Sequence, residues 1–443
     1  MTGSFKTLLC ASLLGLATPV HGSSVTLEAD LILTDVTVYP SPDAEPLPKA
    51  TVWIHDGEIV RVEPRSFEDA GETAFDPAAR VLQGNGRVLT AGFWNSHVHF
   101  TPPTWADPRS MTGEQVAEGM TDMLLRWGFT SVVDTGADPG WLAQLRRHIE
   151  TGVVGPRILE ASGSFVGKDA SPAYLDFKLP ELATAEQAVQ VTRRTLEFKP
   201  DGIKIFTGSF AGPGKALHMT QDVVDAVTKT AHAQDAWVIA HPQSLKGVEL
   251  AVEGGVDILA HTAPDAGKLP PDLVKRIVER DMALVPTLQL WRYELGRGGA
   301  PPPVVERFQN LGVGQLRDVA AAGGEILFGT DVGYMTDFDP TEEYQKMSEA
   351  GLDFRQILAS LTTAPSRRFL GKKTGGTVTR GQSADLVLLA ADPADDPTAF
   401  AQVDLVVRGG RLIYESVQKK TTAHEKTAAP KKETAALVKA DGP

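Results

Sequence analysis

Eight short apolar segments alternate with helical patterns through the middle of the chain, and no other property of the sequence limits the fold so narrowly. The stretches between them, such as residues 114–127 and 185–198, repeat apolar side chains at helical spacing. Eight alternating β and α units favour an α/β fold of the (β/α)8 TIM barrel type over an open doubly wound sheet. The eight segments are residues 87–97, 129–136, 157–163, 202–208, 236–242, 257–263, 282–288 and 325–331.

Both ends of the chain have a different pattern, of short strands joined by turns. Residues 31–88 contain alternating apolar segments with a DG turn, and residues 376–393 and 404–415 repeat that style. We therefore expect the two ends to form one small β-sandwich domain that the barrel interrupts. The expected divisions are a signal peptide at 1–22, the sandwich at 23–90 and 369–415, the barrel at 91–368 and a disordered tail at 416–443.

The first residues have the features of a secretory leader. Lys6 precedes an apolar run from Leu8 to Ala17, and the small residues Val20 and Gly22 precede the expected cut. We therefore expect an exported protein, periplasmic or secreted. Cys10, the one cysteine of the chain, lies in this leader, so we expect no disulfide and no thiolate catalysis in the mature chain.

The charge of the chain limits its partners. With 43 basic and 56 acidic residues, the formal net charge is −13, which argues against a surface for nucleic acid. After the leader, no apolar run approaches the ~20 residues of a membrane-spanning helix. We expect a small-molecule substrate, no nucleic acid and no membrane span, and self-association into a homo-oligomer stays open.

Polar side chains stand at the carboxyl ends of selected strands, where barrels of this type hold their catalytic groups. His97 and His99 end the first strand, and a spacing of two in an extended segment points both imidazoles to one side. His241 and His261 end the fifth and sixth strands, and Asp331 ends the eighth. Because imidazole and carboxylate suit Zn²⁺ and related divalent ions, these side chains predict a metal site.

Lys204 lies within the apolar segment GIKIF of the fourth strand, where burial of an unpaired ammonium is costly. Two explanations stay open. Asp331 or Glu160 would neutralise the ammonium in a salt bridge, or the neutral amine that burial favours would react with carbon dioxide. The carbamate formed in that reaction is an anionic ligand with two oxygens, able to bridge two metals.

Three further side chains near strand ends are candidates for supporting roles. Asp134 and Glu160 follow the second and third strands, and we expect them to hydrogen bond the histidine rings and orient them. Contact with substrate or metal is the alternative for both carboxylates. Tyr334 follows the eighth strand and either lines an apolar substrate pocket or packs within its loop.

The ordered set of HxH on strand one, Lys on strand four, His on strands five and six and Asp on strand eight resembles the amidohydrolase superfamily. The strings GGVDILAHTAP, ILFGTDVG, LTTAPSRRFLG and GQSADLVLLAADP are similar to its imidazolonepropionase-related branch, which includes Xaa-Pro dipeptidases. The resemblance covers roughly Leu31 to Tyr414. Imidazolonepropionases lack the lysine of strand four in their metal site, so Lys204 argues against that activity.

The resemblance implies a centre of two divalent metal ions, Zn²⁺ by preference, in a barrel with a carboxylated lysine. Asp331 would take the proton of a metal-bridging hydroxide as it attacks a carbonyl, and would pass the proton to the leaving nitrogen. His218 lies in the loop where relatives place substrate contacts, which makes it a substrate-binding candidate. The implied ligands are His97, His99 and Asp331 for the more buried metal, His241 and His261 for the more exposed metal, and carboxylated Lys204 bridging both.

These observations predict a metal-dependent hydrolase of amide-type C–N bonds in peptide-like, N-acyl or cyclic amide substrates. One alternative is a mononuclear, deaminase-type enzyme of the same fold, in which His261 is catalytic and Lys204 is merely paired. Its metal ligands would be His97, His99, His241 and Asp331. The other alternative is a non-catalytic protein that binds a metal or a small molecule.

Overall fold

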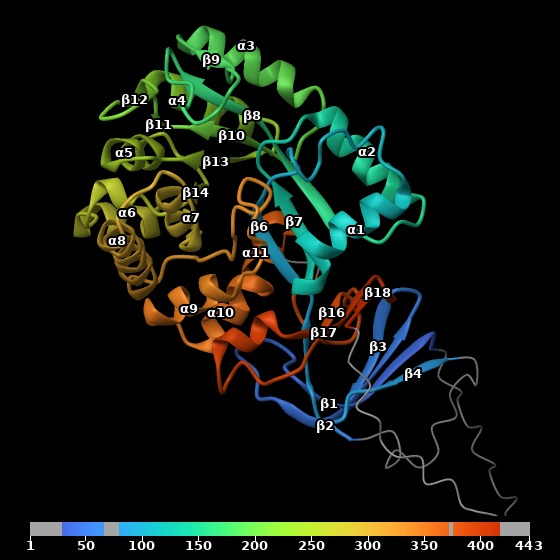
Figure 1. The fold of residues 1–443 in the computed structure, drawn as a ribbon. Helices are drawn as coiled ribbons and strands as arrows, with labels where there is room; N and C mark the ends of the chain where they lie inside the picture. The colour runs from blue at the N-terminus through green and yellow to red at the C-terminus, as the bar shows by residue number, and fades with distance from the viewer. Residues whose placement is uncertain (1–28, 66–78, 372–374, 417–443) are drawn as a thin grey trace, which may run out of the picture.

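The structure, a computed structural model, describes residues 29–65, 79–371 and 375–416 (Figure 1). The expected signal peptide, and the expected tail beyond residue 416, lie outside the described residues. A barrel wrapped in helices forms the larger part of the molecule, and a separate sheet built from both chain ends lies beneath it in the view of Figure 1. The predicted fold class is confirmed.

The barrel strands are parallel and hydrogen bonded in the order β15-β14-β13-β10-β8-β7-β6. Ile203 and Ile205 of β10 pack in the core that the helices cover, so alternation along the strand turns Lys204 into the barrel. The strands are β6 (Phe93–Val98), β7 (Phe129–Asp134), β8 (Arg157–Gly167), β10 (Gly202–Phe206), β13 (Trp237–His241), β14 (Ile258–Ala260) and β15 (Ala283–Val285), with β9 (Glu181–Leu182) paired to β8 and a hairpin of β11 (Gly208–Phe210) and β12 (Ala216–His218).

The eighth apolar segment, residues 325–331, closes the barrel without forming a regular strand. It makes isolated bridges to β15, at Leu284 and Ile326, and to β6, at Val98 and Val332. Between it and β6, the Asp331 amide donates to His97 O at 2.9 Å and the His99 amide donates to Val332 O at 2.8 Å. The closing segment therefore carries Asp331 directly beside the two histidines of β6.

Helices cover the outside of the barrel, and several begin at hydroxyl or carboxylate N-caps. Thr112 and Asp353 form capping boxes with Gln115 and Gln356, and the Ser244 side chain caps α5. The helices are α1 (Gly113–Met123), α2 (Pro139–Glu150), α3 (Ala185–Leu196), α4 (Gln221–His232), α5 (Leu245–Glu253), α6 (Pro271–Glu279), α7 (Gln289–Arg297), α8 (Pro302–Ala321), α9 (Thr341–Glu349), α10 (Phe354–Leu361) and α11 (Thr363–Leu370), with short 3-10 turns η2 (Leu125–Trp127), η3 (Pro264–Ala266) and η4 (Pro397–Ala401).

The terminal sheet joins segments from the two ends of the chain. Antiparallel pairing of β16 with β5, in the register Leu386 to Ala91, connects the two ends. The sheet order is β18-β17-β16-β5-β1-β2-β3, and β4 pairs with β1. Its strands are β1 (Leu31–Val38), β2 (Leu47–His55), β3 (Glu58–Glu63), β4 (Arg80–Gln83), β5 (Val88–Ala91), β16 (Leu386–Leu389), β17 (Val403–Arg408) and β18 (Arg411–Glu415).

Membrane insertion through a helix has no support in the described part of the chain. None of its helices combines the length and the apolar character that crossing a bilayer requires.

Candidate metal centre

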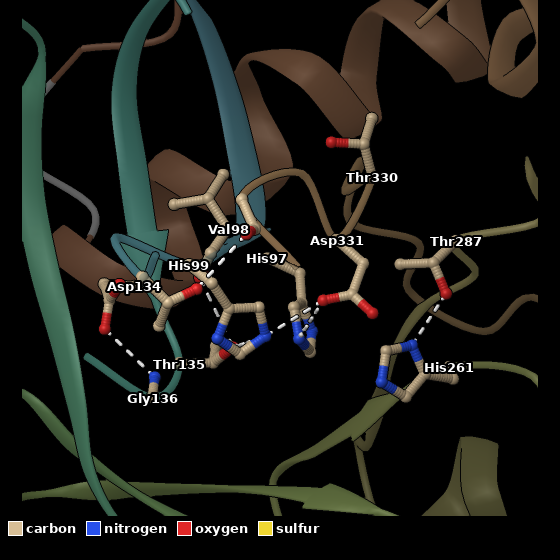
Figure 2. A network of polar contacts seen from close by, with 12 residues as sticks. His97, Val98, His99, Asp134, Thr135, Gly136, His261, Thr287, Thr330 and Asp331 are labelled. Carbon is tan, nitrogen blue, oxygen red and sulfur yellow. Dashed lines mark hydrogen bonds and ion pairs between the residues drawn. The ribbon is translucent and has the colours of Figure 1, made fainter. Parts of the chain in front are cut away.

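Imidazoles and a carboxylate meet in a buried group at the carboxyl ends of the barrel strands (Figure 2). His97, His261 and Asp331 each offer one ligand atom to this group, and the three atoms lie within 4.8 Å of one another. His97 is fully buried, and His261 and Asp331 are each 4% exposed. The sequence separates these residues widely, and the barrel brings them together.

Several polar atoms of this group have no hydrogen-bond partner. His97 Nε2 and His99 Nε2 lie 3.3 Å and 2.9 Å from Asp331 Oδ1. Within the described residues, however, Asp331 Oδ1 and both ring nitrogens of His97 lack a partner with hydrogen-bond geometry. Buried polar atoms without partners are costly, and coordination to a divalent ion would satisfy these. The donor set therefore fits a metal.

His99 and His241 extend the group on its two sides. The His97 ring centroid lies 5.2 Å from that of His99 and 4.6 Å from that of His261. The His241 ring lies 4.9 Å from the His261 ring. All the imidazoles expected from the sequence thus share one site with Asp331.

The buried histidines are neutral at ordinary pH. Burial, with the charge of Lys204, lowers the pKa of His97 to about 3 and that of His241 to about 4. Burial and the neighbouring His97 lower the pKa of His261 well below its usual value. Burial would raise the pKa of Asp331, but the adjacent imidazoles of His97 and His99 hold it well below its usual value. Neutral imidazoles beside an ionised carboxylate are in the states that bind metals.

Lys204 projects into the same region and is 2% exposed. Burial lowers the pKa of its amine to about 8, against the opposing charges of Asp331 and Asp134. No described residue forms a salt bridge with Lys204, and its Nζ lies 5.3 Å from the centroid of the Phe206 ring. Glu160 pairs instead with Arg146, at 3.0 Å. The expected salt bridge from Asp331 or Glu160 to Lys204 is therefore absent among the described residues.

Hydrogen bonds to Thr287 and Gln243 determine which ring nitrogen of His261 and of His241 keeps its lone pair. The Thr287 hydroxyl donates to Pro286 O at 2.9 Å and so accepts from His261 Nδ1, 2.7 Å away, which leaves His261 Nε2 with a lone pair. Gln243 presents Oε1 to His241 Nε2 at 3.3 Å while its amide nitrogen donates to Asp265. His241 Nδ1 therefore keeps its lone pair.

Thr135 and Asn95 are further supports that the sequence did not single out. The Thr135 hydroxyl lies 3.2 Å from His99 Nε2 (Figure 2). Asn95, on β6, donates to Thr330 Oγ1 at 2.7 Å and accepts from the His97 and Thr330 amides. Thr135 follows Asp134, and Asn95 stands two residues before His97. Nearness to these two strand-end residues was the signal in the sequence that could have identified both supports.

The backbone is strained where the ligand candidates stand. His261, Thr287 and Asp331 have φ angles of +123°, +45° and +66°, a region that side chains with a Cβ rarely adopt. Such conformations cost on the order of 1–3 kcal/mol each and concentrate at functional sites. Gly333 (φ +96°) lets the closing segment pass His99, because a Cβ there would come within 1.7 Å of His99 O.

Asp134 and Glu160 are placed differently from expectation. Asp134 accepts hydrogen bonds from the amides of Phe100, Gly136 and Ala137, at 2.8, 3.0 and 2.8 Å (Figure 2). Glu160 accepts from Arg146 and from the hydroxyl of Ser162. In the described chain, the hydrogen bonds of both carboxylates thus go to backbone amides, an arginine and a hydroxyl instead of to imidazoles. Asp134 holds the turn after His99 rather than the ring.

The two substrate-binding candidates lie in different settings. The Tyr334 ring centroid is 6.5 Å from that of His99, and its hydroxyl donates to Glu294 at 2.6 Å and accepts from Arg297. Tyr334 therefore borders the site. His218 Nε2 pairs with Ser244 Oγ at 2.7 Å at the start of α5, and burial lowers its pKa. Within the described residues, the hydrogen bond of His218 goes to Ser244 and not to a histidine of the metal centre.

Comparison with known proteins places the chain among hydrolases. The Amidohydrolase family matches residues 88–413. An uncharacterized protein of Mycobacterium bovis is 30% identical over 201 residues, covering 44% of this chain and 52% of that protein, and an uncharacterized protein of Mycobacterium tuberculosis matches equally. The chain spans about half the length of the curated relatives it matches.

Solved structures share the fold at low identity. A Xaa-Pro dipeptidase with bound methionine in the active site superposes with a TM-score of 0.72 at 21% identity, over 87% of this chain and 100% of that chain. Molinate hydrolase gives 0.69 at 20% identity, over 87% and 94%. Phenylurea hydrolase B gives 0.69 at 22% identity, over 86% and 96%. These likenesses establish the fold alone.

Proposed function

This chain belongs to the amidohydrolase family, and from that premise we propose that it is a metal-dependent hydrolase of amide-type C–N bonds. The observation that carries the proposal is the buried group of His97, His261 and Asp331, whose ligand atoms lie within 4.8 Å. Its members are buried, its imidazoles are neutral and its carboxylate is ionised, and both ring nitrogens of His97 and Asp331 Oδ1 have no hydrogen-bond partner among the described residues. A purely structural role leaves those atoms unexplained.

The proposed centre holds two divalent ions, with Zn²⁺ preferred because the donors are imidazole and carboxylate. His97, His99 and Asp331 would hold one ion, and His241 and His261 the other. Bound ions of this kind acidify water and polarise a substrate carbonyl.

We propose that Lys204 bridges the two ions as a carbamate. It is buried without a salt bridge among the described residues, and a carbamate places a negative group where the ammonium has no counterion. In the reaction, the neutral amine forms an N–C bond with carbon dioxide and releases a proton, so that RNH₂ and CO₂ give RNHCOO⁻ and H⁺.

The proton of the hydrolytic reaction is assigned to Asp331. Its carboxylate is ionised and lies beside the imidazoles, so it can accept a proton from the attacking water and return it to the leaving nitrogen. Thr287 and Gln243 keep His261 and His241 in fixed tautomers. Tyr334 is positioned to border the substrate.

The substrate class we propose is a peptide-like, N-acyl or cyclic amide. Its support is that proteins of the same fold are named as a Xaa-Pro dipeptidase, molinate hydrolase and phenylurea hydrolase B. We also propose, from the signal peptide expected at residues 1–22, that the protein acts outside the cytoplasm, which cell fractionation would test.

A mononuclear enzyme of the deaminase type is the second candidate. It is favoured by one observation: the compact group has three members, enough to hold one ion, although it contains His261 where the sequence predicted His241. In that enzyme Lys204 would carry no carbamate.

The test begins with elemental analysis of the full chain, purified without chelator and with bicarbonate present. Two metal equivalents support the binuclear centre, and one equivalent supports the mononuclear candidate. The loaded protein is then assayed on dipeptides, N-acyl amino acids and cyclic amides.

The matched variants are Asp331→Asn and, as a control, Asp235→Asn at an exposed position whose φ of +57° suits Asn. We expect Asp331→Asn to lower kcat by at least about 100-fold, the order of one general acid–base group, while the control is unchanged. Absence of bound metal after reloading would refute the proposal.

A further inference from the structure

A cavity of about 240 Å³ lies between the barrel and the terminal sheet. It is lined by residues at the end of α2, the start of β8 and the strands β17 and β18. Arg157 is the first residue of β8, whereas the metal centre stands at the carboxyl ends of the same parallel strands. The cavity is therefore at the opposite end of the barrel.

Three arginines face this cavity with a single carboxylate. Arg157, Arg408 and Arg411 line it together with Asp385. Asp385 Oδ1 already accepts from the Gly409 amide at 2.7 Å, and its Oδ2 lies 3.4 Å from Arg157 Nη2. The cavity thus holds a local excess of positive charge in a chain whose net charge is −13.

Two of the three arginines are incompletely satisfied, whereas Arg157 donates to Ser131 Oγ at 3.1 Å and to Asp385. Arg408 Nη1 donates to Gly155 O at 3.2 Å, but its Nε is buried with no hydrogen-bond partner among the described residues. Arg411 is exposed and forms no salt bridge with the described chain. Burial lowers the pKa of Arg408, and the charges of Arg157 and Arg411 lower it further against the opposing charge of Asp385. Three like charges here share one carboxylate, Asp385.

We propose that this cavity is a binding site for a tetrahedral dianion, a phosphate group. Guanidinium groups bind phosphate through paired N–H donors, and three of them converge here from two parts of the fold. A water molecule takes about 30 Å³, so 240 Å³ accommodates a phosphate group with several waters. Ile149, Val153 and Ile413 form an apolar side that leaves room for the organic part of a phosphate monoester.

Two variants test the site. Arg411→Gln removes an exposed guanidinium that forms no salt bridge with the described residues, so the fold should be retained. Arg307→Gln, at an exposed position on α8, is the matched control because it removes one positive charge elsewhere. Thermal unfolding of each variant checks that the fold is intact.

Calorimetric titration of the metal-loaded full chain with orthophosphate, and separately with phenyl phosphate, gives the affinity. We expect saturable binding of one anion per chain, weakened about tenfold or more in Arg411→Gln and unchanged in Arg307→Gln, since hydrogen bonds to a charged group contribute roughly 1.5–3 kcal/mol. Tighter binding of phenyl phosphate identifies an organic phosphate as the ligand, and equal binding identifies free phosphate. Equal affinity in Arg411→Gln and wild type would place the anion elsewhere, such as on the metals, and overturn the proposal, as would the absence of saturable binding.

Discussion

The Thr287 hydroxyl determines how His261 can act. Because it donates to Pro286 O, it accepts from His261 Nδ1, and the other ring nitrogen faces Asp331 and His97 with its lone pair. The positive φ of Thr287 places its hydroxyl at this point. A single side chain thus controls the tautomer and the orientation of a metal ligand.

Thr287→Val should weaken metal binding by about 10- to 100-fold, the usual effect of removing such a support. Valine keeps the shape of threonine, so the fold should change little. Competition with a calibrated chelator measures the affinity. Thr121→Val is the control, because the Thr121 hydroxyl donates to Ala117 O of its own helix and lies away from the metal ligands in the chain. Equal metal affinity in both variants would mean that Thr287 does not act on the centre.

Lys204→Ala should lose one of two metal equivalents and most of the activity, because the proposed carbamate bridges both ions. Elemental analysis measures the loss, and formate or acetate added at high concentration should partly restore the second ion by supplying a carboxylate to the vacated space. Lys275→Ala, at a surface position, is the control. Unchanged metal content in Lys204→Ala would exclude the bridge.

Residue positions in the site were partly predictable. The strand-end positions of His97, His241, His261 and Asp331 follow from counting strands, and the structure brings these side chains together. The partners of Asp134 were not predictable, because a short side chain after a strand bonds the amides of its own turn as readily as a neighbouring ring. Which partner the Asp134 carboxylate takes depends on small differences in backbone position that the sequence does not specify.

Among the elements, α7 and α9 connect the core to the metal centre through Glu343. This side chain is fully buried on α9 and accepts from the Gln289 amide at the start of α7, at 2.9 Å. The turn it holds carries Thr287. Burial raises the pKa of Glu343 to about 8, although the amides of Gln289 and Leu288 oppose the shift. Near neutral pH the folded protein therefore keeps this carboxyl largely protonated.

Stability should consequently depend on pH through Glu343. Above its unfolded pKa of 4.5 the unfolded chain releases the proton while the folded chain keeps it, so the folded state loses stability as the pH rises toward 8. Glu343→Gln cannot ionise and should gain stability relative to wild type over this interval, by up to about 1.4 kcal/mol per pH unit.

Urea unfolding of both proteins at pH 5.5, 7 and 8 tests this difference, in which the titration of all other groups cancels. Glu306→Gln, at an exposed position, should show a constant difference from wild type. A constant difference for Glu343→Gln as well would show that Glu343 is ionised in the folded state throughout.

Element positions were largely predictable, since apolar runs bounded by Gly and polar residues mark the barrel strands. The eighth segment is the exception, because 325–331 is held by bridges and single hydrogen bonds rather than by a ladder. Apolar composition indicates that a segment is buried. Whether it also forms a regular strand depends on the backbone positions of both neighbouring strands, which composition does not give. The joining of the two chain ends was predictable because both ends show the same pattern of short apolar strands and Gly-containing turns.

For the whole molecule, the weakly paired closing segment makes barrel closure and metal binding interdependent. The compact group joins β6, through His97, to His261 after β14 and to Asp331 of the closing segment, so a bound ion would cross-link the segments where the barrel closes. An ion that binds only the folded chain stabilises it by RT ln(1 + [M]/Kd), about 4 kcal/mol at a thousandfold excess over Kd. Removal of the metal should therefore loosen the closing segment first and lower the stability of the entire barrel.

Chelation should lower the unfolding temperature of the loaded protein by several degrees, and hydrogen exchange should rise most at residues 95–99 and 325–333. Differential scanning calorimetry and exchange measured with and without chelator test both effects. In His97→Ala, and in the milder His261→Gln, the chelator should have a smaller effect on both quantities than in wild type, because each variant removes a ligand of one proposed ion. A chelator effect of equal size in these variants would locate the stabilising ion elsewhere, whereas its absence from wild type would show that closure depends on the protein's own hydrogen bonds alone.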